Sequence, residues 1–193
     1  SQHALRNDRA RLGQDLTLGL RMVLLLGLPA GVGLMLLATP VVELLFQRGE
    51  FTAADAQRAA NMLFWYSASV WAYCAMPVVI RAFYALGQTH IPVRVAAGMV
   101  VLNVALNLLL IWPLGEAGLA VSTAICGVVQ LIWLVTLLVR RRTPLGWAHL
   151  AATAARTLLA TAAMAAVTAA LVGHIEPRPE ILTKMVRVLM PGS

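Results

Sequence analysis

The residues best placed to do chemistry are uncharged oxygen donors gathered around one short turn. Asn103 and Asn107 are four residues apart, so they share one face of a predicted helix. Thr123 lies as far after Gly115 as Asn107 lies before it, so an antiparallel hairpin brings these side chains to a similar depth. The backbone carbonyl of Leu119 lies about one turn before Thr123. Hard cations prefer oxygen ligands. The oxygens of Asn103, Asn107, Leu119 and Thr123 therefore predict a candidate Na⁺ site.

A second interpretation of the same residues is structural. Asn, Ser and Thr side chains commonly hydrogen-bond between membrane helices, where each contributes about 0.6–2 kcal/mol. Ser122 adds one more hydroxyl to the set, and no carboxylate lies inside the two arms of the hairpin to balance a cation. Polar groups inside a membrane are nevertheless often functional. A structural network and a cation site therefore both stay open.

Catalytic chemistry finds no support in the sequence. The chain has no HExxH, GxSxG, Walker or GxGxxG pattern. Its four histidines are widely dispersed, at positions 3, 90, 149 and 174. An intramembrane enzyme needs a convergent acid, base or metal, and none is found. We expect a protein that is not an enzyme and that has no cofactor apart from the candidate Na⁺.

The polar residues lie within long apolar stretches. Hydrophobic residues make up 60% of the 193 residues and charged residues 12%, about half the charged share of a soluble domain. A helix needs about 20 apolar residues to cross a bilayer, and only helices satisfy the backbone of such stretches there. We therefore expect an all-α, polytopic transmembrane helical bundle. The five predicted spans cover residues 20–46, 59–80, 93–112, 117–139 and 148–172.

The two ends of the chain differ from this pattern. In residues 1–19, leucines recur at about helical multiples, which predicts an amphipathic helix on the cytoplasmic surface or a helical extension of the first span. Residues 173–180 read as an outward loop, and residues 181–190 are apolar but too short to span. We expect a fragment of a longer protein that stops early in a sixth membrane helix.

The charge distribution predicts membrane contact and an orientation. The net charge is +7, but the arginines lie at span ends, which argues against nucleic acid and for anionic headgroups. Arg156, about two turns inside the fifth span, is a candidate headgroup contact. By the positive-inside rule, the N-terminus is cytoplasmic, and residues 47–58, 113–116 and 173–180 face outward. The basic joints that decide this hold Arg6, Arg9, Arg11, Arg21, Arg81, Arg94, Arg140, Arg141 and Arg142.

Three segments together resemble one known family. They are VELLFQRGEFT at residues 42–52, RAFYALGQTHIPVR at 81–94 and NVALNLLLIWPLGEAGLAVS at 103–122. The first resembles the LF-x-x-G-x-FT signature of the MurJ (MviN) family, the second its FYA segment with a T-x-x-PV turn. The third resembles its N-x-x-x-N…GxxGLA-x-S hairpin. The order and spacing agree over about residues 12–142 and more loosely beyond.

This resemblance implies the C-terminal lobe, about the last six of fourteen helices, of a bacterial inner-membrane lipid II flippase. Such proteins belong to the multidrug/oligosaccharidyl-lipid/polysaccharide exporter superfamily and work by alternating access. The implied partners are lipid II, membrane lipids and the missing N-terminal lobe. In the family, the undecaprenyl tail lies in a groove of the last two helices, here the alanine-rich span and residues 181–190. Lys184 and Arg187 are candidate headgroup contacts there, and the Asn-x-x-x-Asn hairpin is the candidate site of a coupling cation.

Two alternatives to a flippase of lipid II remain. A related polysaccharide or multidrug exporter would have the same fold and would differ in cavity residues that lie outside this chain. A non-transporting membrane scaffold for cell-wall assembly would have a packed interior without a water-filled cavity.

Overall fold

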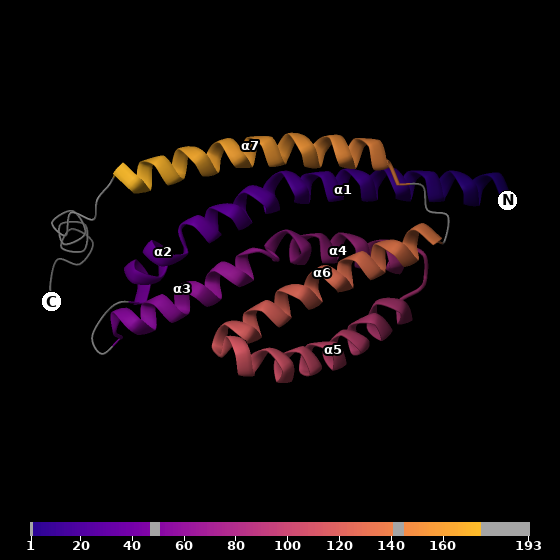
Figure 1. Ribbon diagram of the computed structural model, residues 1–193. Helices are drawn as coiled ribbons and strands as arrows, with labels where there is room; N and C mark the ends of the chain where they lie inside the picture. Colours follow the sequence, from indigo (N-terminus) through magenta and orange to yellow (C-terminus); the bar gives the residue numbers. More distant parts are fainter. Residues whose placement is uncertain (1, 47–50, 141–144, 175–193) are drawn as a thin grey trace, which may run out of the picture.

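Every regular element that the structure describes is a helix (Figure 1). The computed structural model describes residues 2–46, 51–140 and 145–174, and the remaining residues, with the predicted sixth membrane helix among them, lie outside the description. The expected all-α class is confirmed within these ranges. The helices are α1 (Gln2–Leu36), α2 (Ala38–Phe46), α3 (Ala53–Ser67), α4 (Val70–Ala85), α5 (His90–Leu114), α6 (Glu116–Arg140) and α7 (Trp147–His174).

Four of the described helices are long and apolar enough to cross a membrane. They are α1 over Arg11–Leu36, the two arms of the hairpin α5 and α6, and α7 over Trp147–Thr168. The bent pair α3 and α4 makes a fifth span when it is taken as one unit. This number agrees with the polytopic bundle that the apolar stretches predict.

The first predicted stretch is divided between two helices. Helix α1 runs without a break from Gln2 to Leu36, so residues 2–19 extend the first span as one continuous helix. The position of this extension at a cytoplasmic surface stays a prediction. Helix α1 ends at Leu36, whose carbonyl would meet the ring of Pro40 in a continuing helix. Helix α2 then restarts at Ala38, where Pro40 falls in the first turn and needs no donor.

The second predicted stretch contains a bend. Helices α3 and α4 meet at an angle of 40° around residues 67–70. The hydroxyl of Ser67 donates to the carbonyl of Leu63 at 2.6 Å, and that of Ser69 donates to the carbonyl of Tyr66 at 2.8 Å. Such local hydroxyl bonds compete with the helical ladder and bend helices. Residues 59–80 therefore belong to two helices with a bend between them.

The helices are arranged in layers. Helix α7 lies along α1, which in turn packs against α3 and α4 (Figure 1). Helix α6 packs against both α3 and α4, and α5 is the outermost helix, in contact mainly with α6. The hairpin of α5 and α6 therefore stands on the opposite side of the bundle from α7.

The core lies between α1, α4 and α6. Val79 and Phe83 of α4 and Leu134 and Leu138 of α6 have no exposed surface. These side chains form one apolar cluster that also includes residues of α1, α5 and α7. Large exposed apolar side chains are common on the outer faces of the helices, as expected for a protein whose solvent there is lipid.

Two glycines of α1 allow the bend of α3 and α4 to come close. A Cβ atom at Gly27 would lie 3.1 Å from Cα of Trp71, and one at Gly31 would lie 2.8 Å from the carbonyl oxygen of Ser67. Only a glycine fits the second approach, because the neighbour is rigid backbone. Small residues at such crossings let helix backbones pack closely in a membrane.

Candidate functional site

The α5–α6 hairpin positions the predicted polar set. Helix α5 ends at Leu114, and Gly115 turns the chain with a φ of 56°, in the left-handed region that glycine favours. Helix α6 begins at Glu116, whose negative charge suits the positive end of the helix. A Cβ atom at Gly118 would lie 2.5 Å from the carbonyl oxygen of Leu110, so a side chain at this position would not fit between the two arms.

One half of the polar network links the two arms of the hairpin. The amide nitrogen Nδ2 of Asn107 donates to Oδ1 of Asn103 at 3.1 Å, one turn away on α5. Across the hairpin, the hydroxyl of Ser122 hydrogen-bonds Oδ1 of Asn107. Ser122 is fully buried, and both asparagines are half-buried. The sequence argument therefore placed the two asparagines correctly on one face, and it is Ser122 of α6 that faces them.

The other half of the network gathers around the carbonyl of Leu119. The hydroxyl of Thr123 donates to this oxygen at 2.8 Å, and the hydroxyl of Ser122 lies 2.9 Å from it. The phenol of Tyr73 donates to the backbone carbonyl of Thr123 at 3.1 Å. Helix α4 therefore anchors the hairpin at the level of the network.

This arrangement brings several uncharged oxygens together without a carboxylate. The four predicted residues, Asn103, Asn107, Leu119 and Thr123, are joined through Ser122 into one chain of hydrogen bonds. The same oxygens that suit Na⁺ are used here in bonds within the protein. Across the residues that the structure describes, no group of three or more His, Cys, Asp or Glu side chains could hold a metal ion. The geometry accounts fully for a structural role, and a cation role stays a prediction.

The predicted headgroup contacts are only partly described. Arg156 lies on α7 with its side chain exposed. It therefore faces the surroundings of the bundle and not its core. Lys184 and Arg187 lie outside the described residues.

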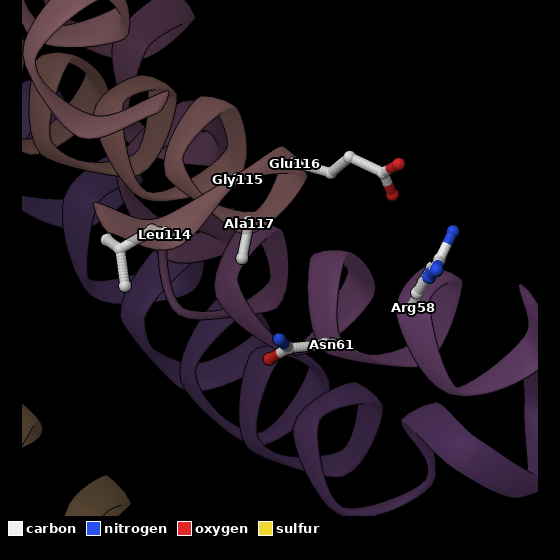
Figure 2. Close-up of a pocket in the computed structure, with 6 residues that line it drawn as sticks. All are labelled: Arg58, Asn61, Leu114, Gly115, Glu116 and Ala117. Carbon is white, nitrogen blue, oxygen red and sulfur yellow. The ribbon is translucent and has the colours of Figure 1, made fainter. Parts of the chain in front are cut away.

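A cleft lined by both polar and apolar groups opens at the turn of the hairpin. It has a volume of about 360 Å³ and lies between α3 and the residues that join α5 to α6. Figure 2 shows Arg58 and Asn61 on the α3 side and Glu116 at the turn, with the charged ends of Arg58 and Glu116 directed toward each other. Opposite charges across the opening suit a polar occupant.

Tyr73 is the member of the network that sequence reasoning missed. It comes from a different predicted span, and no spacing rule links α4 to the hairpin. A signal does exist in Gly127, an isolated glycine in the apolar run of α6. A Cβ atom there would lie 2.8 Å from the ring of Tyr73, so this glycine makes room for the ring.

Comparisons with known proteins match nearly the whole chain to one family. Residues 1–189 match the family described as "Lipid II flippase MurJ". A "Probable lipid II flippase MurJ" from Vibrio cholerae is 41% identical over 106 residues, which cover 55% of this chain and 20% of that protein. Another from Rhizobium tropici is 32% identical over 158 residues, which cover 82% of this chain and 30% of that protein. The chain thus spans about a fifth to a third of the length of these relatives.

A solved structure shows the same arrangement of helices. The structure titled "Lipid II flippase MurJ, inward closed conformation" superimposes with a TM-score of 0.71. The match covers 94% of this chain and 40% of that one, at 19% sequence identity. At this identity the likeness establishes the fold, and its coverage agrees with the prediction that the chain is part of a larger protein.

Proposed function

Because its match to the family extends over residues 1–189, this chain belongs to the lipid II flippase MurJ family, and we propose that it forms part of a lipid II flippase. The flippase moves the undecaprenyl-linked peptidoglycan precursor from the cytoplasmic to the outer leaflet by alternating access. The observation that carries this proposal is the family match over nearly the whole chain. A flippase relocates a lipid without changing its covalent bonds, which agrees with the absence of catalytic motifs in the sequence.

The chain supplies a packed lobe against which the rest of the protein moves. Helices α1, α4 and α6 share one apolar core, which suits a lobe that moves as one unit. The remaining helices of the longer protein supply the contacts to the sugar and pyrophosphate of lipid II. The tail lies against the alanine-rich surface of α7 and residues 181–190, and Arg156, Lys184 and Arg187 contact headgroups along that path. The exposed Arg156 supports this assignment.

The hairpin network is the proposed site of a coupling Na⁺. Oxygens of Asn103, Asn107 and Thr123 bind the ion together with the carbonyl of Leu119, after the hydroxyl of Ser122 rotates away from Asn107. The oxygens of Asn103, Asn107 and Leu119 already accept hydrogen bonds. The ion therefore competes with bonds inside the protein, which favours weak and reversible binding. This suits an ion that must leave in each cycle.

Thr123→Val tests the cation, with Thr136→Val as the matched control. Both threonines are on α6, and each hydroxyl donates to the carbonyl four residues earlier, but Thr136 lies outside the network. We expect NaCl, relative to choline chloride, to raise the thermal stability of the full-length protein and of Thr136→Val. Thr123→Val should lose most of that gain. An equal Na⁺ effect in both variants would remove Thr123 from the site.

The whole-protein proposal is tested by the sidedness of lipid II. Cells depleted of the full-length protein should accumulate lipid II that is inaccessible to reagents outside the cytoplasmic membrane, and re-expression should restore its exposure. The strain must lack any second lipid II flippase. Unchanged sidedness with accumulation of a different polyprenyl-linked glycan would instead identify a related exporter, and unchanged sidedness of every such lipid would favour a scaffold.

A further inference from the structure

A second cleft, whose lining is mostly apolar but includes several polar side chains, lies between α1 and the start of α7, at the opposite end of the bundle from the hairpin turn. Its volume is about 470 Å³. It opens where two of the candidate spans begin, at Arg11–Leu36 of α1 and Trp147–Thr168 of α7. Figure 1 shows that the start of α7 lies beside α1 at this end. The lining relevant here is Gln14, Thr17, Leu18, Arg21, Gly146 and His149.

The cleft contains a positioned guanidinium. Nε of Arg21 donates to the hydroxyl of Thr153 at 2.9 Å, and that hydroxyl donates to the carbonyl of His149 at 2.8 Å. Thr153 is buried, so this bond holds Nε of the guanidinium against α7. The side chain of Arg21 is exposed, and its two terminal nitrogens are further hydrogen-bond donors. A planar, oriented guanidinium is the side chain that best matches a phosphate.

Among the described residues that line the cleft there is no acid to compete for that charge. Arg21 and His149 are the ionisable groups of this described lining, and the nearest acid along α1, Asp15, is not part of it. The imidazole of His149 adds a hydrogen-bond donor, and Gln14 adds an amide. The cleft therefore presents donors from both helices and favours an anion.

The walls of the cleft are fixed by a second pair of bonds. The hydroxyl of Thr17 donates to the carbonyl of Gly13 at 2.7 Å and accepts from the backbone nitrogen of Gly146 at 3.1 Å. This contact ties the start of α7 to α1. Helix α7 begins at Trp147, directly after Gly146 of the lining, so the positive end of its dipole lies beside the cleft and favours negative charge.

An apolar track continues from the cleft along α1. Leu18 lines the cleft, and Met22 and Leu25 follow at helical spacing on the same face. All three side chains are about half exposed or more. A phosphate joined to an acyl chain would therefore meet donors at Arg21 and an apolar surface directly below.

We propose that this cleft binds the phosphate of an anionic phospholipid from the surrounding leaflet, with Arg21 and His149 as the recognising side chains. The lipid is a resident of the interface between α1 and α7. The inference does not depend on the proposed transport of lipid II, because it rests on this cleft alone.

The test uses the full-length protein in nanodiscs without lipid II. Thermal unfolding is measured as phosphatidylglycerol replaces phosphatidylcholine. We expect phosphatidylglycerol to stabilise the wild type and Arg21→Gln to bind it about tenfold more weakly, because a charge-assisted pair is lost. Arg21→Gln retains a donor for Thr153. Arg94→Gln is the matched control, since it removes the same charge from an exposed position of α5 outside the lining.

A second titration identifies the source of the phosphate. Inorganic phosphate is added to the protein in phosphatidylcholine nanodiscs. Stabilisation that depends on Arg21 and is absent with phosphatidylglycerol would overturn the lipid and assign the cleft to a soluble phosphate. Equal losses in Arg21→Gln and Arg94→Gln, or no loss in either, would overturn the site itself. If Arg21→Gln does not fold, His149→Gln tests the site in its place. We expect it to bind phosphatidylglycerol about threefold more weakly than the wild type, and unchanged binding would overturn the site.

Discussion

At the residue scale, Gly118 determines how closely the arms of the hairpin approach. A Cβ atom there would lie 2.5 Å from the carbonyl oxygen of Leu110, which is backbone and cannot turn aside. We expect Gly118→Ala to lower the free energy of unfolding of the full-length protein in detergent by about 1–3 kcal/mol, as overpacking does. The measurement is a thermal or denaturant melt.

Gly98→Ala is the control for this substitution. It lies on the same hairpin, in α5, but nothing is found within 4 Å of its added Cβ atom. Alanine is the better helix former, so we expect the control to be neutral or up to about 1 kcal/mol more stable. Equal destabilisation by both substitutions would contradict the close approach of the two arms.

The polar network shows what spacing along a chain can predict about single residues. The four-residue interval correctly places Asn103 and Asn107 on one face, because helical periodicity is local. Counting from the turn gives the depth of α6 residues, but it does not give the rotation of α6 about its axis. Rotation decides that Ser122 meets Asn107 and that Thr123 bonds within its own helix. The contact of Tyr73 depends on packing between separate spans, which no interval along the chain encodes.

At the element scale, the start of α3 depends on a reciprocal cap. The backbone nitrogen of Asp55 donates to the hydroxyl of Thr52 at 3.3 Å, and the carboxylate of Asp55 accepts from the backbone nitrogen of Thr52 at 3.1 Å. This capping box satisfies donors that the first turn would leave unpaired.

Thr52→Ala should loosen the first turn of α3. Loss of an N-cap hydroxyl costs about 1 kcal/mol, so we expect hydrogen exchange of the amides in residues 53–56 to be about fivefold faster. The amides of α6 serve as an internal reference and should not change. Ala54→Ser, an exposed change in the same turn, is the control. Unchanged exchange in Thr52→Ala would show that the cap does not hold this turn.

The helix breaks mark the limit of sequence prediction at this scale. Hydropathy averaged over a span detects that residues 20–46 and 59–80 are apolar, and it ignores single residues. The division at Leu37 follows from the ring of Pro40, and the bend at residues 67–70 follows from two serine hydroxyls. Both breaks are recognisable by their chemistry, but their hydrogen bonds appear only in the folded backbone.

At the scale of the whole molecule, the alternation of basic joints predicts an orientation. We expect the joint between α4 and α5 to face the cytoplasm and the hairpin turn to face outward. In full-length protein without other cysteines, including Cys74 and Cys126, a membrane-impermeant maleimide should label Glu116→Cys on intact spheroplasts. Thr89→Cys should react only after the membrane is opened. The reverse pattern would overturn the orientation.

The order of the layers also belongs to this scale. Alternating antiparallel spans follow from the short joints, but the sequence does not state which spans touch. Helix α7 returns to pack on α1, the first helix of the chain, and α5 is left with α6 as its main neighbour. Gly27 and Gly31 favour this order of helices, because the absence of a side chain at each lets α1 pack closely against the bend between α3 and α4. Such choices depend on the shapes of complete helix surfaces.

The bond between Ser122 and Asn107 has a consequence for how the chain is made. During synthesis α5 emerges before α6. Alone, it would carry two amide side chains into hydrocarbon with only their bond to each other, and polar groups left unpaired there cost several kcal/mol. Helix α6 supplies the hydroxyl partner, and Gly115 allows the chain to reverse within one residue. We therefore expect α5 to remain beside the protein-conducting channel until α6 follows, and the two helices to enter the lipid together as a pair.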